Sequence, residues 1–211
     1  MSTLAASPTR TFGWRTVALA VGFAVLAVLA WSVATYNRLV ALDQQVQAQW
    51  AQVENVYQRR LDLVPNLVRT VQGAAAFERG TLLAVTEART RAQSVAASTG
   101  GGVPGDPAAF ARSQAAQNEL SSALGRLMVV VERYPDLHAT ENFRDLQAQL
   151  EGTENRIAVE RMRFNEAARD FNARRASFPT MLVAGAFAGR FHARPYFTAA
   201  PEARSAPVVQ F

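Results

Sequence analysis

The sequence contains no cysteine and no lysine, and only two of its 211 residues are histidine. The lack of cysteine excludes disulfides and thiolate metal ligands. The lack of lysine excludes a phosphate-binding P-loop, which requires that residue after its glycines. Neither His138 nor His192 belongs to a Glu-x-x-His pair, so the pattern indicates neither a di-metal carboxylate site nor a histidine-activated nucleophile. We therefore predict no catalytic residues, no metal site and no cofactor, and a protein that is not an enzyme.

All 22 basic residues are arginine, and the formal net charge is +5. Residues 43–178 nevertheless carry 16 arginines and 16 acidic residues, so this long region is neutral. The excess of arginine over acidic residues lies around an apolar segment near the N-terminus and in the C-terminal tail. Nucleic-acid binding requires a basic face that displaces phosphate counterions, so we do not expect a nucleic-acid partner.

An apolar run of 22 residues without charge, 16–37, lies between Arg15 and Arg38. A helix of this length covers roughly 33 Å, enough to cross a bilayer. We predict a single transmembrane anchor over 16–37, preceded by a short flank, 1–15, with the lipid bilayer as a partner. A cleaved signal peptide is the alternative, because Ser32 and Ala34 form a small-x-small site. The run exceeds the usual signal core of about 7–15 residues, which favours the anchor.

Arginine counts on the two sides of this run bear on orientation. Arg10, Arg15 and the terminal amine precede it, whereas Arg38 follows it. The margin is about one or two charges and favours a cytoplasmic N-terminus. The following domain is then expected on the outer, periplasmic side.

Helical periodicity dominates the rest of the chain. Apolar residues recur at steps of three and four from Leu39 to Leu61, in the regions 67–95 and 110–134, and from Phe143 to Phe178. Pro65 is predicted to break or kink the first helix, with Asp62 as a cap. The glycine- and proline-rich stretch 97–107 is predicted to be a flexible, non-helical connection. Thr140 is predicted to be the N-cap of the last long helix.

These patterns predict an all-α fold, in which the transmembrane helix continues into an antiparallel four-helix bundle over residues 38–179. A tail, 180–211, is expected to pack on the bundle or on the membrane surface. Four polar residues fall on the apolar stripes, where cross-helix hydrogen bonds are expected to pair them. They are Glu78, Thr153, Glu160 and Arg174.

A polar cluster near Pro65 is the best candidate for a specific site. Arg59, Arg60, Asp62 and Asn66 lie close in sequence, and Glu78, Glu154 and Arg156 are expected to meet them across the bundle. The favoured interpretation is a network of caps and ion pairs that stabilises a corner. The alternative is a groove that binds a small ligand.

The C-terminal residues Val209, Gln210 and Phe211 form an apolar-x-apolar end. A PDZ domain accepts such an end by β-strand addition. The sequence is therefore compatible with recognition of the tail by an envelope protease or chaperone, although a tail strapped to the bundle remains the favoured alternative.

Two long motifs, "RRLDLVPNLV" and "LQAQLEGTENRI", carry a resemblance to a known family. Together with the surrounding sequence from Tyr36 to Pro179, they make the chain resemble the LemA family of bacterial membrane proteins. The resemblance implies a single-span anchor in the bacterial inner membrane and a helical bundle, with no established activity. We expect a non-enzymatic scaffold that interacts with unidentified envelope or membrane proteins, and self-association stays open. The alternatives are a regulator or substrate of envelope proteolysis and a small-ligand binder at the Arg59–Asn66 corner.

Overall fold

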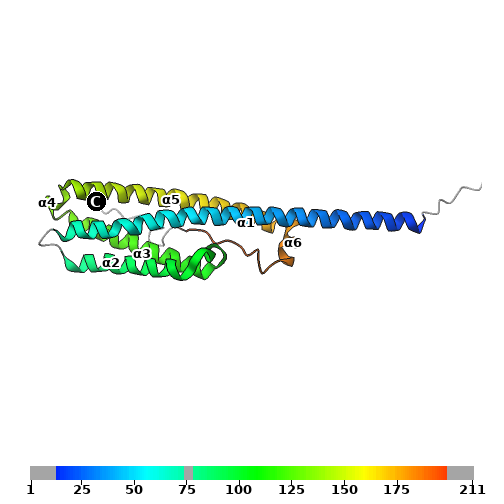
Figure 1. Cartoon of the computed structure of the whole chain (residues 1–211), viewed down its shortest axis with the longest axis horizontal. Helices are drawn as coiled ribbons and strands as arrows, with labels where there is room; N and C mark the ends of the chain where they lie inside the picture. The colour runs from blue at the N-terminus through cyan, green and yellow to red at the C-terminus, as the bar shows by residue number, and fades with distance from the viewer. Residues whose placement is uncertain (1–12, 74–77, 199–211) are drawn as a thin grey trace, which may run out of the picture.

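A computed structural model describes residues 13–73 and 78–198, and within these ranges every regular element is helical. Figure 1 shows the long helices α1, α2, α3 and α5 lying lengthwise beside one another in an elongated helical body. Helix α1 packs along α5 and also contacts α2, and α2 packs along α3. The elements in chain order are α1 (Trp14–Gln72), α2 (Arg79–Thr99), the 3-10 helix η1 (Gly100–Gly105), α3 (Pro107–Val131), α4 (Pro135–His138), α5 (Glu141–Ala176) and α6 (Thr180–Ala186).

The N-terminal part of α1 extends away from the helical body as a single bare helix (Figure 1). Its most apolar window has a mean hydropathy of 2.4, and none of this window is buried. Large side chains such as Trp14 and Leu26 are 79% and 67% exposed, and Thr35 is the first buried residue of α1. An apolar helix of this length that the protein itself does not cover is suited to a bilayer. These features support a single-pass membrane protein anchored by this segment.

The predicted break at Pro65 is wrong, because α1 runs without interruption from Trp14 to Gln72 with Pro65 inside it. Proline lacks the N–H that would bond to the carbonyl four residues earlier, which here belongs to Leu61. That carbonyl instead accepts a hydrogen bond of 2.9 Å from Nε of Arg89 on α2. A neighbouring helix thus satisfies the carbonyl that Pro65 leaves without its usual partner, and Asp62 is not a cap.

The connection between α2 and α3 is more helical than predicted. Helix α2 continues to Thr99, and the glycine-rich residues that follow form η1. The carboxylate of Asp106 then accepts a hydrogen bond of 2.8 Å from the backbone N–H of Ala108, and Pro107 occupies the first turn of α3. An aspartate N-cap followed by proline is a favoured helix start, so the chain turns sharply without a long loop.

The apolar stripe of α5 is buried from Phe143 to Phe171. It ends earlier than predicted, because Arg174 is exposed and Phe178 is 79% exposed. The polar residues on the stripe do not form the expected cross-helix bonds. Thr153 donates to the carbonyl of Gln149 in its own helix, and Glu160 pairs with Arg163. Thr140 occupies the N-cap position of α5, but its hydroxyl donates backwards to the carbonyl of Leu137.

The buried apolar residues form two clusters. The first lies between the later part of α1, α2, α3 and the start of α5 and contains mainly leucine, valine and alanine. The second surrounds the middle of α1, from Leu39 to Tyr57, and the later part of α5, and is rich in aromatic residues. Phe191 and Phe197, which follow α6, belong to this second cluster. The segment after the last helix therefore completes part of the core.

Candidate functional site

Arg60 is the centre of the first polar site. Its side chain extends from α1 and is only 1% exposed. Nη1 donates to the hydroxyl of Ser121 at 2.6 Å and to the carboxylate of Glu154 at 2.9 Å. Nη2 donates to the carbonyl of Gln117 at 3.3 Å and also to its side-chain oxygen. A single guanidinium thus connects α1 with both α3 and α5.

Burial governs the electrostatics of this site. Removal from water lowers the pKa of Arg60 below its ordinary value, and the nearby carboxylate of Glu154 opposes that shift. The Glu154 side chain is itself 53% exposed, so one partner of the ion pair lies inside the helical body and the other at its surface. Truncation of the exposed partner would leave a buried cation with neutral hydrogen-bond acceptors only.

An open groove lies beside this ion pair. It has a volume of about 300 Å³ and is lined by residues of α3 and α5, with Arg60 of α1 also contributing. Leu124, Met128 and Leu150 provide apolar walls, and Gly125 leaves space, because a Cβ built there would meet nothing within 4 Å. This combination of apolar walls and a polar end matches the smallest small-molecule sites.

The structure brings together only two of the seven residues predicted for the cluster, Arg60 and Glu154. Arg59 and Arg156 are exposed. The expectation that all seven converge is wrong, because the corner does not form at Pro65 and α1 continues past it.

The other three predicted residues also have partners elsewhere. Asp62 accepts a hydrogen bond from Gln58, and Asn66 accepts one from Arg69, both within α1. Glu78 precedes α2, is exposed and lies 3.4 Å from Arg133. These pairs are local or lie at the surface, where ion pairs contribute little stability.

A second buried ion pair joins residues that the sequence analysis did not select. Nη2 of Arg194 lies 2.5 Å from Oδ1 of Asp43, and each side chain is 6% exposed. Nη1 of Arg194 also donates to the carbonyl of Pro104 in η1 at 3.3 Å, and its guanidinium lies 5.0 Å from the ring centre of Phe171. A Cβ at Gly105 would lie 3.1 Å from Nη1, so the glycine-rich turn leaves room for this arginine.

Two asparagines of α5 bind the backbone of the segment 191–198, which has no regular secondary structure. Asn172 accepts from the N–H of Arg194 at 2.8 Å and donates to its carbonyl at 2.9 Å. Asn165 makes the same pair of bonds with Phe197, at 2.8 Å and 3.0 Å. The two asparagines are seven residues apart and therefore share one helix face. We name this arrangement, with the Asp43–Arg194 ion pair, the tail clasp.

An aromatic cluster supports the tail clasp. The ring of Phe197 lies 4.7 Å from that of Phe110, 5.4 Å from that of Phe164 and 6.0 Å from that of Trp50, measured between centroids. The guanidinium of Arg161 lies over the Phe197 ring, 5.0 Å from its centroid. The tail residue is therefore held in the core by several rings as well as by its backbone.

The spacing of Asn165 and Asn172 is the signal that could have indicated the tail clasp. Two asparagines at the same heptad position, next to a buried stripe, offer donors and acceptors for an extended strand. Nothing in the sequence pairs Asp43 with Arg194. The predicted recognition residues Val209, Gln210 and Phe211 lie outside the described residues. In the described part of the chain, no group of three or more His, Cys, Asp or Glu side chains could hold a metal ion.

Comparison with known proteins gives consistent matches. The profile of the LemA family matches residues 49–211. Magnetosome proteins MamQ 1 and MamQ 2 of Paramagnetospirillum magneticum are each 29% identical to the chain over 201 residues, covering 88% of this chain and 72% of the relative. Magnetosome protein MamQ of Magnetospirillum gryphiswaldense is 29% identical over 189 residues, covering 81% of this chain and 69% of the relative. Because the family profile spans most of the chain, the protein belongs to the LemA family.

Proposed function

We propose that the protein is a non-enzymatic scaffold of the bacterial inner membrane, anchored by the apolar part of α1, that presents an antiparallel four-helix bundle to other envelope or membrane proteins. The observation that carries this proposal is that two buried arginines each join separate parts of the fold. The guanidinium of Arg60 connects α1 with α3 and α5. The guanidinium of Arg194 connects the tail with η1 and α1. Charges used in this way stabilise one arrangement of helices.

The continuity of α1 supports the same proposal. One helix of 59 residues includes both the apolar segment and the core of the helical body. A helix of this length is roughly 90 Å long. Because no loop separates the two parts, the bilayer constrains the direction in which the body points. A body held upright on its anchor can present its surface at a fixed height above the membrane.

Site-specific photo-crosslinking in cells tests the scaffold function. A photoreactive amino acid at Met162, which is 55% exposed beside a groove between α5 and the tail, is expected to capture defined membrane or envelope proteins or a second copy. The same group at Leu26, which is 67% exposed in the anchor, provides a lipid-facing control. If neither Met162 nor further exposed positions of α2 and α3 give protein adducts above that control, the scaffold proposal fails. Capture of a soluble small-molecule substrate instead would favour another class of function.

Small-ligand binding at the Arg60 groove is the second candidate, favoured by the space at Gly125. Native mass spectrometry of the full chain, extracted from its own membrane, would detect a bound molecule as added mass. The substitution Gly125→Leu places a side chain in the groove and should remove that mass. Gly152→Leu is a matched control, because Gly152 also has nothing within 4 Å but does not line the groove. Absence of added mass in the unsubstituted protein would argue against this candidate.

Recognition of the tail end by a PDZ domain stays a separate proposal, supported by the sequence of the last three residues alone. Deletion of Val209, Gln210 and Phe211 should abolish capture of the protein by such a domain. Unchanged capture after the deletion would end this proposal.

A further inference from the structure

The surface around α6 carries large apolar side chains that are half or more exposed. Met181 and Leu182 in α6, and Phe178 and Phe187 on either side of it, are between 50% and 79% exposed. The opposite side of α6 is buried through Thr180, Val183 and Ala184. An apolar cluster of this kind marks an interaction surface.

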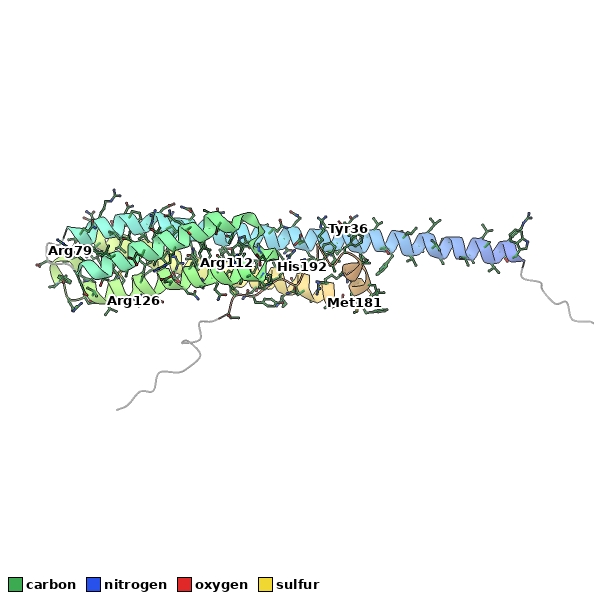
Figure 2. The ribbon with its side chains drawn as sticks, turned by 90° about the horizontal axis from the view of Figure 1, so that it is seen from below. Tyr36, Arg79, Arg112, Arg126, Met181 and His192 are labelled. Atoms are coloured by element: carbon green, nitrogen blue, oxygen red, sulfur yellow. The ribbon has the colours of Figure 1, made fainter. Side chains whose placement is uncertain are left out.

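The position of α6 identifies what covers this surface. Helix α6 packs on α1, and Figure 2 shows Met181 and Tyr36 at the same end of the body, the end from which the bare part of α1 extends. The rings of Tyr36 and Phe187 lie 5.0 Å apart in an edge-to-face arrangement. Tyr36 is at the end of the predicted transmembrane segment, 16–37. The exposed apolar surface therefore continues the surface of the anchor at the depth where the helix meets the body.

The polar groups around α6 suit a membrane interface. Arg190 donates a hydrogen bond of 2.9 Å to the hydroxyl of Tyr36, and its guanidinium lies 5.6 Å from the centre of that ring. Tyrosine and arginine with apolar stems and polar ends are favoured at the level of lipid headgroups. From Phe171 to Thr198 the chain has four arginines and no acidic residue. Two of these arginines, Arg174 and Arg190, are exposed, so the net charge suits anionic headgroups.

We propose that α6, with Phe178 and Phe187, is an interfacial helix that inserts its exposed apolar side into the same bilayer that the anchor spans. The inference rests on the membrane anchoring in the proposed function. It divides the tail between two roles. Residues 191–198 bind the helical body through the tail clasp, whereas α6 contacts lipid beside α1. Two lipid contacts on one rigid body restrict its tilt relative to the membrane.

The lack of native cysteine permits a direct test. A single cysteine introduced as Leu182→Cys carries an environment-sensitive fluorophore, in the full chain reconstituted into vesicles of phosphatidylethanolamine and phosphatidylglycerol. Leu83→Cys is the matched control, because both leucines are 61% exposed. Leu83 lies in α2 near Arg79, which Figure 2 places at the opposite end of the body. Leu26→Cys in the anchor is the positive control. Spin-labelled lipids serve as quenchers, with the label near the headgroup for positions 182 and 83 and deep in the acyl chain for position 26, which lies near the middle of the span.

We expect quenching at position 182 that is several-fold greater than at position 83 and a blue-shifted emission at position 182. Quenching at 26 but not at 182 would overturn the interfacial role and leave the anchor intact. A label at 182 that is shielded from water but not quenched by lipid would assign the surface to a protein partner and overturn the inference as well. Lack of quenching at 26 would refute the anchor itself. If circular dichroism shows that Leu182→Cys has lost helix, Phe178→Cys, at a position 79% exposed, takes its place.

Discussion

The Asp43–Arg194 ion pair gives the most specific prediction about stability. The substitution Asp43→Leu leaves the guanidinium of Arg194 in a site where its side chain is only 6% exposed, without a carboxylate. Loss of one partner from a buried pair costs about 3–5 kcal/mol. Arg194 can avoid that cost if the segment 191–198 leaves the body and exposes the charge to water. The question is whether the rest of the tail clasp can hold the segment in place.

The other contributions to the free energy of holding the segment 191–198 on the body are close to balance. Burial of the Phe191 and Phe197 side chains contributes about 1.5–3 kcal/mol each. Six hydrogen bonds join the segment's backbone to the body, at about 1 kcal/mol each. Ordering its eight residues costs about 1–2 kcal/mol per residue. Since these contributions nearly cancel, Asp43→Leu should release the segment, with the largest loss of protection in residues 191–198.

Hydrogen exchange measured by mass spectrometry on the full chain in detergent micelles checks this prediction. A change of about 3–5 kcal/mol corresponds to a loss of protection in residues 191–198 of roughly 150- to 4,000-fold. The control is Glu119→Leu, which removes the exposed pair of Arg91 and Glu119 at 2.6 Å and should cost about 0–1 kcal/mol. The double substitution Asp43→Leu with Arg194→Met should restore much of the protection. Wild-type protection in Asp43→Leu, or no recovery in the double variant, would refute the reasoning.

Three further predictions concern single residues. Pro65→Ala should raise the thermal unfolding midpoint, with a gain of about 1–3 kcal/mol, because the new N–H can bond to the Leu61 carbonyl that Arg89 already contacts; a lower midpoint would contradict this. Burial raises the pKa of Tyr57 above its ordinary value of 10.0. The neutral phenol therefore contributes stability that is fully present below pH 10.0 and is lost as pH rises through the folded-state pKa. Tyr57→Phe should make the unfolding midpoint less sensitive to pH above 10.0, and an equally steep alkaline loss would exclude this cause. Asn172→Ala removes two hydrogen bonds to the tail backbone and should reduce its protection from exchange roughly tenfold or more; intact protection would show that Asn172 contributes nothing to the tail clasp.

The polar sites illustrate how far sequence patterns can lead. Arg60 and Glu154 were selected because they lie near Pro65 and on the facing helix, and the structure does pair them. The other selected residues do not join them, because the selection assumed a corner at Pro65. The partner that allows α1 to continue there is Arg89, which lies 28 residues after Leu61. No local pattern reveals that a distant arginine will take one particular carbonyl.

The sequence by itself determined the features that depend on local periodicity. A charge-free run long enough for a bilayer predicted the exposed start of α1, and apolar steps of three and four predicted helices, because burial of one helix face requires that spacing. Only the tertiary structure decided where α1 ends and how the tail binds. Asp43 and Arg194 are separated by 151 residues, and their pairing depends on the combined placement of α1, η1 and the tail. Apolar burial is non-directional and can be read from spacing, whereas a buried charge needs one partner at one distance, which only the assembled helices provide.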